Sequence, residues 1–177
     1  MTGTIAAAAG IKPPIIQYSE LSPMLVVFGV AIAGVLVEAF VPRPFRRGVH
    51  LFLTLGGLVV AFALTIATAT RASLFSGHAA GRIAAMGAVA VDRPTLFIQG
   101  TILVLAFVSV LLIAESSHDV SPFVAQAAAV PGSAEEREGL LAGITHTEVY
   151  PLTLFAIGGM LLFPAANDLL TMFVALE

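Results

Sequence analysis

Four long apolar stretches determine what this chain can fold into. They contain neither Lys nor Arg, and they cover residues 23–41, 50–69, 94–114 and 149–165. A helix that crosses a lipid bilayer needs about 20 predominantly apolar residues. Within lipid, an open chain satisfies its own backbone hydrogen bonds only as a helix. The sequence therefore predicts an all-α integral membrane protein, a multi-spanning bundle of four complete transmembrane helices with the start of a fifth.

The composition supports this class and excludes several others. Of the 177 residues, 58% are hydrophobic and 11% are charged, whereas soluble proteins contain about 25% charged residues. The net charge of −3 gives no basic surface for nucleic acid. Without cysteine there is no disulfide, iron–sulfur ligation or thiol catalysis. The four histidines lack metal-ligand spacing, and no nucleotide-binding motif or nucleophile elbow is present.

The chain divides into four parts. Residues 1–22 form an extramembrane N-terminal tail, because the apolar run at 5–10 has no basic residue before it and is too short for a signal peptide. Residues 23–115 hold helices one to three. Residues 116–147, rich in Ala and Gly, form a cytoplasmic connection. Residues 148–177 hold helix four and the start of helix five.

Capping residues mark two of the predicted helix starts. Ser22 and Pro23 have the residue types preferred at the N-cap and the first helical position. Asp92 stands in the same relation to the third helix.

Arginines give the orientation. Arg43, Arg46 and Arg47 lie in the short turn between the first two helices, and basic residues in short loops stay in the cytoplasm. This places the N-terminus outside, although three further arginines in the second, external connection weaken the asymmetry.

Glu177 is the most informative residue. A fifth apolar helix capped by Asn167 or Asp168 reaches Glu177 after nine positions, about 13.5 Å along the helix axis. That depth is near the middle of the hydrocarbon layer, where a chain end is unfavourable, so we expect further membrane-embedded chain. An embedded carboxylate indicates a function in proton transfer. Its cationic partner must lie outside these residues; a neutral Glu177 hydrogen-bonded to a neighbouring helix is the alternative.

The other polar residues of the apolar stretches have simpler interpretations. Asp168 lies on the opposite helix face from Glu177 and is expected to be a cap. Glu38, beside the arginine turn, is expected to reach the membrane interface, with an interior proton path as the alternative. Glu115 is explained in the same way. Gln99 and Thr101 are expected to form interhelical hydrogen bonds rather than line a hydrated cavity.

The last 28 residues resemble a known family. The segment YPLTLFAIGGMLLFPAANDLLTMFVALE at 150–177 is similar to helices four and five of the antiporter-like membrane subunits of respiratory complex I. The segment VDRPTLF at 91–97 is similar to the residues that enter the family's helix three. Within the family, the chain looks most like the subunit N type of actinobacterial enzymes.

The resemblance implies a role in proton translocation coupled to electron transfer from NADH to quinone. Glu177 matches the family's helix-five glutamate, which faces a lysine of helix seven, and inverted helix repeats would begin at helix four (compare). The chain would hold no redox centre; FMN and iron–sulfur clusters would belong to partner subunits. It would lie in the bacterial plasma membrane beside other membrane-arm subunits. Alternatives are a subunit of a cation/proton antiporter or membrane-bound hydrogenase, or a scaffold without transport activity.

Overall fold

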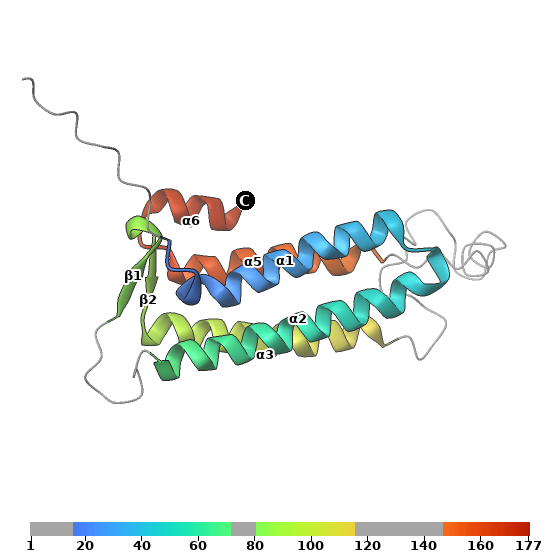
Figure 1. The fold of residues 1–177 in the computed structure, drawn as a ribbon, viewed down its shortest axis with the longest axis horizontal. Helices are drawn as coiled ribbons and strands as arrows, with labels where there is room; N and C mark the ends of the chain where they lie inside the picture. The colour runs from blue at the N-terminus through green and yellow to red at the C-terminus, as the bar shows by residue number, and fades with distance from the viewer. Residues whose placement is uncertain (1–15, 72–80, 116–146) are drawn as a thin grey trace, which may run out of the picture.

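The computed structural model describes residues 16–71, 81–115 and 147–177. In this part of the chain, five α-helices are joined by a small β-hairpin and two short 3₁₀ turns (Figure 1). The elements are α1 (Tyr18–Phe40), α2 (Arg43–Arg71), β1 (Arg82–Ala84), η2 (Ala85–Gly87), β2 (Val89–Val91), α3 (Arg93–Ala114), α5 (Val149–Leu162), η4 (Phe163–Ala165) and α6 (Leu169–Leu176). The predicted helical class is confirmed, whereas the hairpin was not predicted.

The four longer helices form one bundle. Helix α1 packs against α2 and α5, and α3 packs against α2 and α5. Each helix contributes buried aliphatic side chains to a common core, among them Val27, Leu58, Leu103 and Leu154. Helix α6 lies along α5 and begins at the hairpin end of the bundle (Figure 1).

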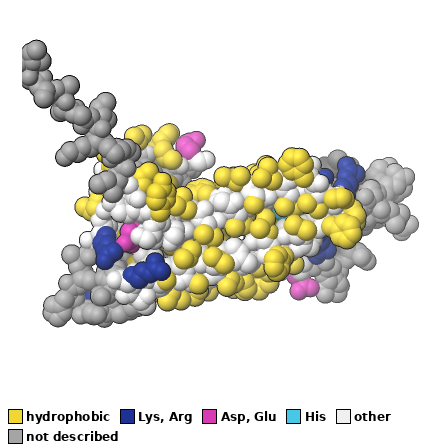
Figure 2. Space-filling view, viewed as in Figure 1, with side chains coloured by type: hydrophobic (Ala, Val, Ile, Leu, Met, Phe, Trp, Pro, Cys, Tyr) yellow, Lys and Arg dark blue, Asp and Glu magenta, His cyan; other side chains and the backbone are white. Residues whose placement is uncertain are grey.

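The outer surface of the bundle is apolar. Large side chains such as Phe52, Leu105 and Leu112 are exposed, and hydrophobic atoms cover the middle of the visible face, with basic side chains at its two ends (Figure 2). Helices α1, α2 and α3 are long and apolar enough to span a membrane, and the helical segment Val149–Ala165 is shorter. An apolar belt between charged ends is the distribution expected for a protein in a bilayer.

The predicted cap of the third helix is confirmed, and that of the first is wrong. Asp92 accepts a hydrogen bond from the Thr95 backbone N–H at 2.9 Å. Helix α1 instead begins at Tyr18, so Pro23 lies inside it. Proline there removes the N–H that would bind the Ser19 carbonyl. The Ser22 hydroxyl donates to that carbonyl at 2.8 Å, so the helix continues through the proline.

The arginine segment is helical rather than a loop. Helix α2 begins at Arg43, and only two residues separate it from α1. Pro44 fits the first turn of a helix, where its missing N–H has no partner to lose. Arg46 Nε donates to the Val41 carbonyl at 2.6 Å, and Arg47 donates to the Ala114 carbonyl at the end of α3, at 2.8 Å. The basic end of the bundle is thereby tied together.

The hairpin stabilises the opposite end. Its strands are antiparallel, and its turn includes Gly87 at φ +104°, a conformation that glycine adopts without strain. The Asn167 side chain donates to the Gly87 carbonyl at 2.8 Å. Arg82 donates to Glu20 of α1 at 2.7 Å. The hairpin therefore links α1 to the residues immediately before α6.

Candidate functional site

Helix α6 is fixed at its start by the predicted cap. Asp168 accepts a hydrogen bond from the Thr171 backbone N–H at 2.6 Å, which stabilises the ionised carboxylate and lowers the pKa of Asp168. From this cap α6 runs back beside α5 and ends part-way along the bundle (Figure 1). Asp168 and Glu177 stand at opposite ends of α6. The interpretation of Asp168 as a cap is confirmed.

Glu177 lies at the edge of a groove formed mainly by α3, α5 and α6. The groove has a volume of about 990 Å³, and its other lining side chains include Phe28, Ile102, Phe155 and Val174. Of the described residues that line it, Glu177 is the one ionisable side chain. Glu177 is itself exposed, and its neighbours in the groove are apolar.

The position of α6 depends on a close approach between two helices. A Cβ atom on Gly159 of α5 would lie 2.6 Å from the Ala175 carbonyl oxygen of α6. Only glycine allows this separation, because real Cβ atoms essentially never approach another heavy atom within 3.0 Å. Small residues of this kind allow membrane helices to pack closely, and this close contact lies two residues before Glu177.

A second cluster of ionisable groups lies at the basic end of the bundle, around Glu38. Arg46 donates to Glu38 Oε1 at 2.6 Å. On the other oxygen, Oε2, Glu38 accepts from the Thr147 hydroxyl at 2.7 Å and contacts His50 Nε2 at 3.1 Å. The proximity of Glu38 to the arginines was expected; its contacts with His50 and Thr147 were not.

His50 is buried within this cluster. The predicted apolar stretch began at His50, but α2 begins seven residues earlier, so His50 lies inside the helix and not at its end. The side chain is 1% exposed and stacks on the Tyr150 ring of α5, with ring centroids 5.9 Å apart. The signal available in the sequence was a histidine that adjoins the apolar run of α2. His78, His118 and His146 lie outside the described residues, as do most of the predicted tail and connection (1–15 and 116–146).

The remaining polar residues have structural roles. Gln99 donates to the Leu161 carbonyl of α5 at 2.9 Å, so its predicted interhelical hydrogen bond is confirmed. Thr101 instead donates to Phe97 within its own helix, at 2.9 Å. Glu115 is the exposed C-cap of α3.

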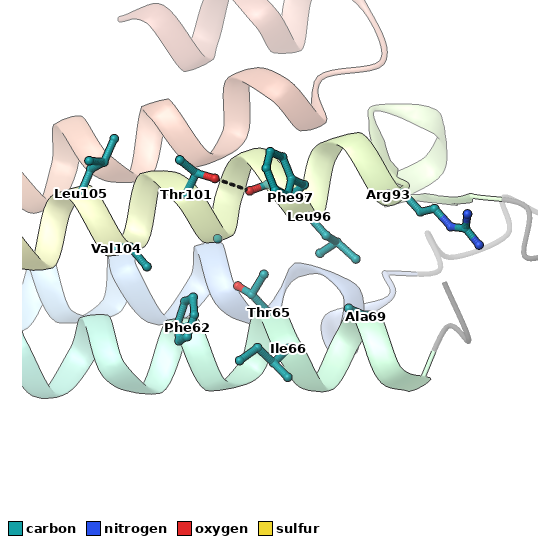
Figure 3. Close-up of a pocket in the computed structure, with 11 residues that line it drawn as sticks. Phe62, Thr65, Ile66, Ala69, Arg93, Leu96, Phe97, Thr101, Val104 and Leu105 are labelled. Atoms are coloured by element: carbon teal, nitrogen blue, oxygen red, sulfur yellow. Dashed lines mark hydrogen bonds between the residues drawn. The ribbon is translucent and has the colours of Figure 1, made fainter. Parts of the chain in front are cut away.

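The groove between α2 and α3 differs from the Glu177 groove. Its volume is about 690 Å³, and it is lined by apolar residues such as Phe62, Ile66 and Phe97, with Arg93 at one end (Figure 3). The Thr101 hydroxyl faces the Phe97 carbonyl there. No acidic side chain is among the described residues that line this groove, so it offers no carboxyl for proton transfer.

The described residues contain no group of three His, Asp or Glu side chains that could hold a metal ion. Two places among the described residues are candidates for proton transfer: Glu177 at its apolar groove, and the cluster of Glu38, Arg46, His50 and Thr147 at the basic end. The two sites are not brought together, because α6 starts at the hairpin end while the cluster lies where α1 meets α2 (Figure 1).

Comparison with known proteins gives a consistent result. The chain is 51% identical over 98% of its length to NADH-quinone oxidoreductase subunit N of Rhodococcus opacus. Identities to the proteins of the same name are 48% for Mycobacterium tuberculosis, over 93% of the chain, and 55% for Acidothermus cellulolyticus, over 94%. The chain spans about a third of the length of these curated relatives (34%, 33% and 31%). No family model matches.

These relatives confirm the resemblance to actinobacterial subunit N that the sequence indicated. Together with the three apolar helices, they identify a membrane-embedded protein.

Proposed function

We propose that this chain, as a close relative of subunit N over nearly all its length, is part of a proton-translocating membrane-arm subunit of NADH:quinone oxidoreductase. The observation that carries the proposal is the 48–55% identity to proteins of that name, which extends over 93–98% of the chain. A membrane helix bundle with an acidic residue at an apolar groove fits this role.

Glu177 is the proposed proton-carrying residue. A carboxyl group among apolar side chains favours its neutral form, and an approaching cation favours the ionised form. Movement of a cation toward and away from Glu177 would therefore release and rebind a proton. The resemblance implies that this cation is a lysine from the remainder of the subunit.

The proposal includes partners, cofactors and orientation. The chain works among other membrane-arm subunits in the bacterial plasma membrane, and FMN and iron–sulfur clusters are held by partner subunits. The three arginines at the start of α2 support a cytoplasmic location for the basic end of the bundle. The N-terminus is then on the outside.

The alternatives receive less support. A subunit of a cation/proton antiporter or a hydrogenase would share the embedded glutamate, but each relative compared above is named as a subunit of NADH-quinone oxidoreductase. A scaffold without transport activity would make Glu177 dispensable, and this consequence is directly testable.

The test is Glu177→Gln in the complete subunit within the whole enzyme complex. Glutamine keeps the size and hydrogen-bonding capacity of the side chain but does not ionise. We expect the complex to assemble and NADH-driven proton pumping into inverted membrane vesicles to fall at least tenfold, in line with the effect of removing an acid–base group. The matched control is Glu115→Gln, at the exposed end of α3, which should leave pumping unchanged. Normal pumping by assembled Glu177→Gln enzyme would overturn the assignment.

A further inference from the structure

The contact between Glu38 and His50 joins a partly exposed carboxylate to a buried imidazole. The Glu38 side chain is 28% exposed and the His50 side chain is 1% exposed. Glu38 Oε2 lies 3.1 Å from His50 Nε2, a distance at which a proton can pass between the two groups along a hydrogen bond. The carboxylate therefore connects the histidine to the exterior of the bundle.

The other nitrogen of His50 faces inward. Nδ1 is buried and has no hydrogen-bond partner among the described residues. It faces α1 at Gly34, where a Cβ atom would lie 3.7 Å from it. Because leaving a buried polar atom unpaired is unfavourable, such exceptions indicate a catalytic role or an internal water molecule. The two ring nitrogens therefore have different surroundings. Nε2 contacts the partly exposed Glu38, and Nδ1 faces the interior of the bundle.

The charged and polar groups around the imidazole come from three helices and from the turn before α5. Helix α1 contributes Glu38, and α2 contributes Arg46, which binds the other carboxylate oxygen. The turn before α5 contributes the Thr147 hydroxyl, bound to Glu38 Oε2, and α5 contributes the Tyr150 ring stacked on the imidazole. Arg46 and Thr147 hold the carboxylate in place, while Tyr150 holds the ring.

We propose that His50 is a proton-relay residue, which accepts a proton from the Glu38 carboxyl at Nε2 and releases one from Nδ1 to water inside the bundle. In the first step, Glu38 takes a proton from the water around the basic end of the bundle and transfers it to Nε2. The Glu38 carboxylate is restored, and an imidazolium forms. In the second step, the Nδ1 proton leaves and the imidazole is neutral again, now with its proton on Nε2. Transfer of that proton back to Nδ1, by tautomer exchange through water or by rotation of the ring, restores the starting form. One proton enters and one leaves, so the charge is balanced.

The imidazole suits this task because its charge changes between pH 5 and 8 and because it has two separate nitrogens. The inference rests on the proposed proton-translocating function, to which it adds a route at the basic end of the bundle. A purely structural histidine would need only to donate to Glu38 and pack on Tyr150. The two roles make different predictions for a side chain that donates but does not titrate.

The decisive variant is His50→Gln in the complete enzyme complex. The glutamine amide can still donate to Glu38 but cannot relay a proton. We expect pumping by the assembled complex to fall at least tenfold, since general acid–base groups contribute about 10²–10⁴-fold. We also expect the enzyme to lose the part of its pH–rate profile between pH 5 and 8 that the histidine contributes. The matched control is Thr101→Val, which removes a hydroxyl that donates within its own helix, away from the cluster, and no titratable group; it should pump within about twofold of the wild-type enzyme.

The outcomes separate this inference from the proposed function. Assembled His50→Gln enzyme with normal pumping and an unchanged pH profile overturns the relay, while loss of pumping in Glu177→Gln in the same assay leaves the proposed function intact. If His50→Gln does not assemble, Glu38→Gln tests the same step, because an amide oxygen still accepts from Nε2 but delivers no proton. Normal pumping by that variant also overturns the relay.

Discussion

The close approach of α5 and α6 allows the position of Glu177 to be perturbed without touching its side chain. Gly159→Ala adds one methyl group, whose carbon would lie 2.6 Å from the Ala175 carbonyl oxygen. Separations below 3.0 Å essentially never occur for Cβ atoms and those below 3.4 Å are rare, so the two helices must move apart by about 0.4–0.8 Å. The obstacle is backbone, which cannot rotate away as a side chain can.

The expected result is an assembled but poorly pumping enzyme. Overpacking of this kind costs about 1–3 kcal/mol, which a complex of many helices tolerates. Glu177 follows Ala175 by two residues, so it moves with α6. A displacement of about 1 Å between reacting groups can slow a reaction about 100-fold, and we expect roughly tenfold slower pumping for this smaller shift.

The assay is NADH-driven acidification of inverted membrane vesicles, followed by quenching of an acridine dye and normalised to the amount of assembled complex. The matched control is Gly56→Ala in α2, where a Cβ atom meets nothing within 4 Å; this variant should pump normally. Wild-type pumping by Gly159→Ala would refute the reasoning, since the α5–α6 separation would then not determine the function of Glu177. Equal defects in both variants would show that the added methyl group acts through some other effect.

Two predictions concern the helix caps. Asp92→Ala removes the acceptor for the Thr95 N–H and should lower the stability of α3 by about 1 kcal/mol, seen as faster amide hydrogen exchange at its start, whereas Asp92→Asn should retain most of the cap. The pKa of Asp168 is lowered from its usual value of 3.8 by the Thr171 N–H, so the stabilisation of α6 is complete above that value and is lost as the pH falls through the lowered pKa. Hydrogen exchange at the Thr171 amide, corrected for its intrinsic pH dependence, should show this loss, and Asp168→Asn should abolish its pH dependence.

The bundle helices could be predicted from the sequence because the bilayer imposes a length and an apolar composition on each one. The caps at Asp92 and Asp168 were predictable for a similar reason, since a single side chain satisfies nearby backbone groups. The start of α1 was not, because the hydroxyl of Ser22 replaces the hydrogen bond that Pro23 lacks. The hairpin strands are three residues each, too short to produce a recognisable alternation.

The cluster around Glu38 could not be predicted from the sequence without knowledge of the fold. Glu38 and Thr147 are 109 positions apart and meet only because α1 and the start of α5 lie together. Glu38 alone, beside three arginines, is explained by the membrane interface. The buried histidine changes that interpretation. Its burial follows from the early start of α2 at Arg43, which was not predicted because the arginine-rich segment was interpreted as a turn.

The same packing determines where Glu177 stands. The cap at Asp168 sets the direction of α6, and the bond from Asn167 to Gly87 attaches its start to the hairpin. Gly159 then sets the distance between α6 and α5. Because α5 also packs against α1 and α2, the groove beside Glu177 and the cluster containing His50 are built on one helix. A shift of α5 should therefore change the positions of both Glu177 and His50, the residues that we propose to carry protons.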